Sequence, residues 1–495
     1  MQIPLEVLEI IKKLNQADFD AYIVGGCVRD LIISKIKELK RNPKDWDIAT
    51  NAKPEQIQKL FPDSVYENEF GTVLVKTGSE SPDLKIIEVT TLRKEGKYSD
   101  KRHPDKIEFA KTIEEDLGRR DFTVNAMAIR IKNSERTLID PFDGQKDLKD
   151  KLIRTVGDAK KRFSEDGLRL MRAIRFACEL NFQIESLTLE AIKKNASLLS
   201  FISKERIHDE LIKIINSSEA AKGILLLQET GLLKQIIPEL EKSIGVTQNK
   251  HHIYTVWEHL WRSLEYACAK KYSLEVRLAS LFHDIGKPYT KEGEGIDSTF
   301  YNHEWQGAKI TSHILSRLKF SNDKSERIVK LVRCHGFVYD TEITTDAAIR
   351  RLLVKIGKEN IQELAQVREA DRIGSGCPKA LPFRLRHFLF RVEKVLQELE
   401  GQQPSLKVLK INGNDIIKIL KIEPSSKIGA ILNILLEEIL DDPKKNTKKY
   451  LEKEVKELNQ LPESELNKKQ KIAQEKYENL LKEAEEEIKK KYYVN

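Results

Sequence analysis

Cysteine is scarce in this 495-residue chain, and its placement excludes several classes of protein. The five cysteines include no C-x-x-C pair, which argues against both a disulfide framework and a zinc ribbon. No apolar run approaches the length of a membrane helix. The first residues, MQIPLEVLEIIKKLNQ, have the pattern of an amphipathic helix and not of a signal peptide. We therefore expect a soluble cytoplasmic protein with no membrane contact.

A large excess of one charge is also lacking. The chain has 86 Lys and Arg against 78 Asp and Glu, a formal net charge of +8. Such a surplus is compatible with a polyanionic partner and does not establish one. The length favours roughly three or four domains.

Strand-like and helical patterns alternate up to about residue 140. The stretches AYIV, GTVLVKT, LKIIEVTTL, KIEF and VNAMAIRI have strand composition, and helices are expected near residues 5–15 and from Val28. After Asp140 only helical periodicity continues. The pattern predicts an α+β chain in which a head with one mixed sheet precedes an all-α body.

The head contains a group of residues that suits phosphate chemistry. The strand AYIV runs into Gly25 and Gly26 and then a helix that carries Arg29. Glycines at such a turn let backbone N–H groups approach a phosphate. Asp45 and Asp47 follow, and in an extended segment they point to the same side. The two carboxylates either belong to a solvated loop or bind a divalent cation.

Transfer of a phosphoryl or nucleotidyl group needs this combination, because catalysis consists mainly of positioning and charge neutralisation by metal ions. Magnesium prefers a few carboxylates together with the phosphates of the substrate. Glu88 in the strand IIEVTT is a candidate third carboxylate, and a solvent-facing glutamate at a strand edge is an equal alternative.

These motifs resemble the family of bacterial-type tRNA nucleotidyltransferases and poly(A) polymerases, whose head is similar to that of DNA polymerase β. The resemblance spans roughly residues 20–180 and includes GGCVRD, DWD, RRDFTVNA and EDGLRLMRAIRF. It implies that Asp45 and Asp47 are catalytic and hold Mg²⁺. It also implies that Gly26 and Arg29 touch the nucleotide and that Arg120 contacts the triphosphate.

The EDGLRLMRAIRF segment suggests how a base is chosen. On a helix, Asp166, Arg169 and Arg172 would share one stripe, which could also be a row of surface salt bridges. A carboxylate acceptor beside a guanidinium donor matches the pairing edges of cytosine and adenine, and not those of uracil or guanine. The resemblance agrees, since it implies that Asp166 and Arg169 select CTP and ATP while Arg172 and Arg175 line the pocket.

The product is less closely defined. Residues 93–106 form a polar stretch with one Gly and one Pro, which predicts a mobile loop. It looks like the loop of family members that add the terminal A, and so favours complete CCA addition to a tRNA 3′ end. A poly(A) polymerase, a CC-adding or A-adding enzyme, and a phosphohydrolase with an RNA-docking head remain as alternatives.

Histidine is rare, and seven of the ten histidines lie between His251 and His335. His283 and Asp284 adjoin each other at the end of an apolar helix, and His259 precedes them. Adjacent helical residues diverge by about 100°, so both reach one ion only at the edge of the helix. Other helices must then supply the remaining ligands.

This second region resembles the HD family of metal-dependent phosphohydrolases. His259, His283, Asp284 and Asp371 follow the order of its metal ligands, and His303 and His335 match positions that serve a second metal. Imidazole and carboxylate ligands suit Mn, Ni, Fe or Zn. The resemblance implies hydrolysis of 2′,3′-cyclic phosphates, with an HD fold that lacks turnover as the alternative.

We expect a nucleotidyltransferase head over residues 1–140, a helical neck that binds nucleotide and RNA over 141–245, an HD domain over 246–380 and a tRNA-binding helical tail over 381–495. Gly-containing turns near Asn412 and Ser425 precede helices and could hold a phosphate, although the family usually has Gly at the position of Ser425. The charge-balanced C-terminus predicts a solvated or partner-binding helix that is partly disordered.

Overall fold

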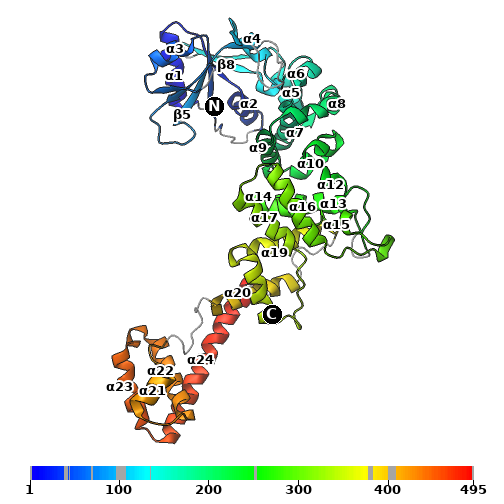
Figure 1. The fold of residues 1–495 in the computed structure, drawn as a ribbon. Helices are drawn as coiled ribbons and strands as arrows, with labels where there is room; N and C mark the ends of the chain where they lie inside the picture. Colours follow the sequence, from blue (N-terminus) through cyan, green and yellow to red (C-terminus); the bar gives the residue numbers. More distant parts are fainter. Residues whose placement is uncertain are drawn as a thin grey trace. The chain divides into compact units, whose positions relative to one another are not determined.

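The computed structural model describes residues 3–37, 43, 45–67, 71–95, 107–133, 135–249, 253–376, 383–399 and 409–492. The chain divides into two compact units (Figure 1). The first contains Met1–His335 and Ala370–Cys377, and the second contains Gly336–Glu369 and Pro378–Asn495. None of the described helices has the length and apolar character needed to cross a membrane.

The head is built on a sheet of seven strands in the order β3-β4-β5-β2-β1-β8-β9. β2 pairs parallel with β5, and the other neighbours pair antiparallel, so the predicted mixed sheet is confirmed. The strands are β1 (Ala21–Val24), β2 (Asp47–Thr50), β3 (Ser64–Tyr66), β4 (Thr72–Lys76), β5 (Ile86–Thr91), β8 (Ala128–Lys132) and β9 (Glu135–Ile139).

Amphipathic helices complete the head. α1 (Leu5–Gln16) forms where a helix was expected and buries Val7, Ile10, Ile11 and Leu14 on one face. The other helices are α2 (Gly26–Lys37), α3 (Pro54–Leu60), α4 (Ile113–Gly118) and α5 (Gly144–Asp150). β6 (Arg93–Glu95) and β7 (Ile107–Phe109) form a two-stranded sheet at the ends of the expected mobile loop, whose residues 96–106 lie outside the described residues.

Helices dominate after residue 140, as expected, with one exception. β10 (Leu152–Ile153) pairs parallel with β11 (Gln183–Ile184), although no strand was expected there. Two-residue strands are too short to show an alternating pattern, so only the folded chain reveals them. The neck helices are α6 (Ala159–Glu165), α7 (Leu168–Leu180), α8 (Ser186–Asn195), α9 (Lys204–Asn216), α10 (Ala220–Glu229), α11 (Leu232–Ile236) and α12 (Pro238–Glu241).

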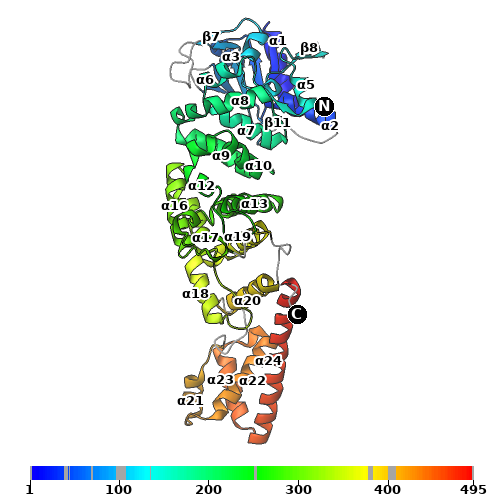
Figure 2. The same ribbon diagram turned by 90° about the vertical axis from the view of Figure 1, so that its right-hand side faces the viewer.

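The histidine-rich region folds as a helical group in the first unit (Figure 2). α14 packs on both α13 and α17, and α16 packs on α17. Its helices are α13 (Val256–Ala269), α14 (Leu274–Phe282), α15 (Lys287–Thr290), α16 (His303–Arg317), α17 (Asn322–Cys334) and the C-terminal end of α19 (Ile361–Gly374).

The second unit contains the C-terminal helices, and its last helix differs from the expected solvated tail. α24 packs against α22 and α20, and its residues Leu466 and Ala473 lie in the core (Figure 2). Lys394 on α20 donates to Glu485 on α24 at 3.0 Å. Two well-spaced apolar residues anchor a helix that composition alone describes as polar. These helices are α18 (Asp346–Ile356), α20 (Phe383–Leu399), α21 (Gly413–Leu420), α22 (Ser426–Asp441), α23 (Lys448–Asn459) and α24 (Glu463–Tyr492).

Helices begin at both of the places expected in the tail, with Gly413 as the first residue of α21 and Gly429 inside α22. The Asn412 side chain accepts the N–H groups of Asn414 and Asp415 and so caps the N-terminus of α21. Ser425 precedes α22 and makes no side-chain cap. Phosphate binding at these turns stays a prediction.

Candidate functional site

The sheet places three acidic residues at one end of the head. Asp47 begins β2, and the parallel register sets it directly opposite Glu88 on β5. On its other side, Val24 at the end of β1 faces Asp47. Asp45 is exposed and lies two residues before Asp47. Asp45, Asp47 and Glu88 therefore gather where β1 ends and the turn into α2 begins.

Gly25 forms the turn from β1 into α2, and its geometry requires glycine. Its φ is +81°, in the region that L side chains rarely adopt. A Cβ atom there would lie 3.1 Å from Arg120 Nη1 and 3.2 Å from Asp47 Oδ2. Gly26, chosen from the sequence as the nucleotide-binding glycine, has more space, since its Cβ would meet only Arg29 Nη2 at 3.7 Å. Gly25 is the glycine that the local geometry needs.

The three carboxylates repel one another. Burial raises the pKa of Asp47, the Arg120 guanidinium opposes this rise and Asp45 adds to it. Burial also raises the pKa of Glu88, and Asp47, Glu67 and Asp45 raise it further. A divalent cation among these oxygens would remove the repulsion, and an all-oxygen set suits Mg²⁺. The residues present therefore fit the metal that the sequence implied.

Arg120 lies beside Asp47, and Arg29 lies in the first turn of α2. Arg29 is 9% exposed, and it donates to Asp30 at 3.0 Å and to Asn125 at 2.9 Å. Arg120 lies 3.4 Å from Asp116, whose pKa is lowered by Arg119 and Arg120 against the effect of burial. Sequence reasoning missed Asn125 and Asp116, which hold these cations in place. Asn125 lies within the RRDFTVNA motif, so this motif could have pointed to it as a site residue.

Asp166 does not lie on the helix where it was expected. It is the extended residue that ends α6, with φ −140° and ψ 109°, and α7 begins only at Leu168. Its Oδ1 accepts the N–H of Leu168 at 2.9 Å, as a helix-capping side chain does. Its Oδ2 pairs with Arg206 of α9 at 2.8 Å. Asp166 therefore shares no helical stripe with Arg169.

The arginines of α7 also have partners that the sequence did not suggest. Arg169 pairs with Glu165 at 2.5 Å, in place of Asp166. Arg172 pairs with Asp121 at 2.6 Å and, with Arg169, lowers the pKa of that buried carboxyl to about 2 despite the opposing effect of burial.

Arg175 is 7% exposed and lies 3.3 Å from Glu210 of α9. It is buried where α7 contacts α9, and its expected place in the nucleotide pocket stays a prediction. Glu210 was not among the site residues expected from the sequence.

The second cluster brings all six expected metal ligands together from five helical segments. His259 Nε2 lies 2.8 Å from His283 Nε2, 3.2 Å from Asp284 Oδ2 and 3.2 Å from Asp371 Oδ1. His303 Nε2 and His335 Nε2 each lie 3.4 Å from Asp284 Oδ1. Histidines from four helical segments thus converge on the carboxylate of Asp284.

Asp284 divides the cluster into two groups of side chains that could each hold a metal ion. Its Oδ2 faces the group with His259 and His283, and its Oδ1 faces the group with His303 and His335. The ligand atoms of each group lie within 4.8 Å of one another. Mixed nitrogen and oxygen donors suit a transition metal. The site fits two such ions, with Asp284 shared between them.

Backbone carbonyls orient the imidazoles. The Nδ1 atoms of His283, His303 and His335 lie 2.8, 2.7 and 2.7 Å from the carbonyl oxygens of Ser280, Phe300 and Val332, respectively. An Nδ1–H that donates to a carbonyl leaves Nε2 with its lone pair free to bind a metal. The backbone thus selects the tautomer that a metal site needs.

Gly286 lets α16 approach Asp284. A Cβ atom at Gly286 would lie 2.2 Å from the carbonyl oxygen of His303 and 2.6 Å from the N of Gly307. Both are backbone atoms, so a larger residue would push the start of α16 away. Gly286, two residues after Asp284, therefore sets the position of His303.

The electrostatics of the cluster are those of a cation site. Burial lowers the pKa of His283, but Asp284 and Asp371 outweigh this effect and raise it to about 10. Lys287 and His283 hold the pKa of Asp284 well below its usual range despite its burial. Lys287 lies 2.6 Å from Asp284 and donates to Gln248 at 2.6 Å. Sequence reasoning missed both Lys287 and Gln248.

The fold and the two clusters define a class of protein, a nucleotidyltransferase head joined to an HD-type metal centre. Family models match in this order. They are the Poly A polymerase head domain over residues 21–154, the probable RNA and SrmB-binding site of polymerase A over 181–244, and the HD domain over 256–375.

Similar proteins extend this result. The CCA-adding enzyme of Ligilactobacillus salivarius is 32% identical over 463 residues, which cover 91% of this chain and 97% of that protein. That of Geobacillus stearothermophilus is 45% identical over 228 residues, and this match covers 46% of the chain and 53% of the relative. A crystal structure of the Bacillus stearothermophilus CCA-adding enzyme in complex with CTP is 29% identical, with a TM-score of 0.58 and coverage of 93% of this chain and 98% of that one. The chain belongs to the tRNA nucleotidyltransferase family of CCA-adding enzymes, and it is a nucleotidyltransferase.

Gly25→Ala tests the tight turn of the head. We expect nucleotide incorporation into RNA to fall about 100-fold, because the new Cβ displaces Arg120 or Asp47 from its position beside the turn. Gly78→Ala is the matched control. Its φ is +75° and a Cβ there meets nothing within 4 Å, so it carries the same backbone strain without the crowding. Equal activity of the two variants would show that strain, and not crowding, is what matters.

Metal analysis of the purified full chain tests the second cluster. We expect two transition-metal ions per chain, one for each group of ligands. Asp284→Ala should lose both ions, and His335→Ala should lose one. His313→Ala should keep both, because His313 is an exposed histidine on the same helix as His303. Full metal content in Asp284→Ala would contradict the shared-ligand arrangement.

Proposed function

We propose that this protein adds C, C and A to tRNA 3′ ends, using CTP and ATP and Mg²⁺ held by Asp45 and Asp47. The main support is the parallel register that sets Asp47 beside Glu88, next to Asp45, the Gly25 turn and Arg120. This arrangement suits transfer of a nucleotidyl group. The CCA-adding names of the relatives and the CTP complex of the Bacillus enzyme support the choice of product and substrate.

Each residue of the head has a task in this reaction. Asp45 and Asp47 hold the cation, which when bound stabilises negative charge on the reacting phosphates. Glu88 lies where it can complete the carboxylate set or accept a proton. Arg120 presents a guanidinium to the triphosphate, and Asp116 orients it. Arg29 is held rigid by Asn125 and positions the first turn of α2 beside the nucleotide.

Base selection requires Asp166 and Arg169 of the neck to give up their present ion-pair partners. Asp166 now pairs with Arg206, and Arg169 with Glu165. A cytosine or adenine that offers an amine donor and a ring-nitrogen acceptor would compete for both side chains. Asp166 Oδ1 continues to accept the N–H of Leu168. This contact holds the backbone of Asp166 in place while its Oδ2 changes partner. Arg172 and Arg175 hold α7 in place through Asp121 and Glu210.

Asp47→Ala tests the head reaction. We expect extension of tRNA lacking its CCA end to fall by at least about 1,000-fold, because the metal loses a ligand at the reacting phosphate. The assay is incorporation of labelled CTP and ATP by the full chain. Asp83→Ala, at an exposed loop position of the head, is the control and should retain wild-type activity. Wild-type extension by Asp47→Ala would contradict the assigned mechanism.

Sequencing of the extended tRNA identifies the product. The A-adding tRNA nucleotidyltransferase of Deinococcus radiodurans is 34% identical over 334 residues, which cover 66% of this chain and 75% of that protein. A product that ends in CCA supports the proposal. Addition of A only to tRNA that already ends in CC, addition of CC alone, or a long A tail would each replace it.

We propose a second activity for the HD cluster, metal-dependent hydrolysis of phosphoesters such as 2′,3′-cyclic phosphates. The specific observation in its favour is the pair of ligand groups that share Asp284. Transition metals fit these donors and, when bound, supply charge stabilisation to a phosphate. Lys287 adds a buried ammonium beside Asp284. Such an activity could clean a damaged tRNA end before it is rebuilt.

Separate substitutions distinguish the two activities. We expect hydrolysis of a 2′,3′-cyclic nucleotide, measured with added Mn²⁺ or Ni²⁺, to be lost in His283→Ala and unchanged in Asp47→Ala. The His283→Ala protein should still extend tRNA. Absence of hydrolysis by the wild-type chain with any of Mn, Ni, Fe or Zn would contradict this second activity and leave the tRNA reaction standing.

A further inference from the structure

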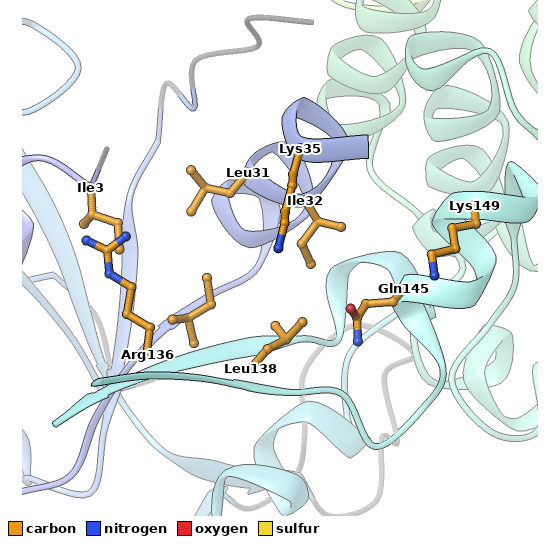
Figure 3. Close-up of a pocket in the computed structure, with 9 residues that line it drawn as sticks. Ile3, Leu31, Ile32, Lys35, Arg136, Leu138, Gln145 and Lys149 are labelled. Atoms are coloured by element: carbon orange, nitrogen blue, oxygen red, sulfur yellow. The ribbon is translucent and has the colours of Figure 1, made fainter. Parts of the chain in front are cut away.

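A cavity of about 430 Å³ lies between α2, the hairpin of β8 and β9, and α5 (Figure 3). Neither the nucleotidyl-transfer residues nor the HD ligands line it. Figure 3 shows Lys35 extending from α2 into this space, and Gln145 and Lys149 reaching toward it from α5. The lining residues are Ile3, Leu31, Ile32, Lys35, Ile129, Arg136, Leu138, Gln145 and Lys149.

The wall of the cavity is aliphatic. Ile3 and Leu31 are each 4% exposed, and Ile32, Ile129 and Leu138 are partly exposed in the space. Burial of these partly exposed side chains by a ligand would be favourable. The volume lies within the range of about 300–1,000 Å³ that small-molecule pockets span. No aromatic ring is among the nine lining residues, so the cavity offers no surface on which a nucleobase would stack.

The polar part of the lining is cationic. Lys35, Arg136 and Lys149 are lining residues, and no Asp or Glu is among the nine. Within the described part of the chain, Lys35 and Lys149 make no ion pair. Gln145 donates to Asp140 at 3.3 Å, which leaves its carbonyl oxygen as its other polar group. Unpaired ammonium groups beside an apolar wall complement a ligand with an anionic head and an aliphatic body.

We propose that this cavity binds a small aliphatic anion, with the chain of a medium-length fatty-acid carboxylate against Ile32, Ile129 and Leu138 and its head group at Lys35 and Lys149. The ammonium groups neutralise the carboxylate, and the aliphatic side chains exclude water from the chain. The ligand would contact α2, the helix that begins at Gly26. Binding does not require nucleotidyl transfer, so it is measured directly.

Titration calorimetry of the full chain with decanoate, below its micelle concentration, tests the proposal. We expect saturable binding of one decanoate per chain, weaker binding of the uncharged decanol and no binding of inorganic phosphate. Leu138→Glu should weaken decanoate binding at least 10-fold, because it places a repelling charge in the apolar wall. The Lys35→Glu, Lys149→Glu double variant should weaken it by a similar factor while leaving decanol binding unchanged.

Lys146→Glu is the matched control, since Lys146 is an exposed lysine on α5 that does not line the cavity. It should bind decanoate as the wild type does. Absence of decanoate binding to the wild type, equal loss in Lys146→Glu, or retention of binding in Leu138→Glu would each overturn the proposal. Circular dichroism and melting of each variant verify folding. If Leu138→Glu does not fold, the decanoate affinity of the lysine variant decides in its place.

Discussion

Parallel pairing of β2 with β5 is the interaction on which the head site depends. It places Asp47 opposite Glu88, and the short connection from Asp45 to Asp47 adds a third carboxylate. Three acids in such proximity are unfavourable on their own. Burial raises the pKa of both Asp47 and Glu88, and the neighbouring carboxylates raise it further. The sheet holds them together because its backbone hydrogen bonds and buried strands over-determine the register. A cation would then find a site already assembled.

The histidine-rich cluster also brings ionisable side chains close together, but it combines acids with histidines and a lysine. Asp284 and Asp371 are buried, and both contact the imidazoles of His259 and His283. Lys287 lies 2.6 Å from Asp284. In this cluster the ends of helices, and not the pairing of strands, position several of the residues. His283 and His335 end α14 and α17, while His303 begins α16. His259 and Asp371 join them from within α13 and α19, so that five helical segments supply the cluster.

Local signals predicted much of the fold and many of the site residues. The strand AYIV, the helix over 5–15 and the mixed sheet follow from periodicity and were found. The HD ligands were predicted by type and order, and the fold brings them together. Partners of the charged residues were not predicted, because Arg206, Glu210 and Asn125 lie on elements distant in sequence. The packing of α24 was also missed, since Leu466 and Ala473 are sparse among polar residues.

The order of acids, histidines and glycines along the chain was enough to predict the family and the candidate site residues, because few folds use these residues in that order. The motifs of the head, the motifs of the HD region and the turn at Gly25-Gly26 were recognisable from the sequence. Which charged side chains form ion pairs could be seen only in the folded structure. It set Asp166 against Arg206 in place of Arg169, and it divided the oxygens of Asp284 between two groups of imidazoles. The physical reason is that an ion pair depends on distances between elements, and helix packing sets those distances in three dimensions.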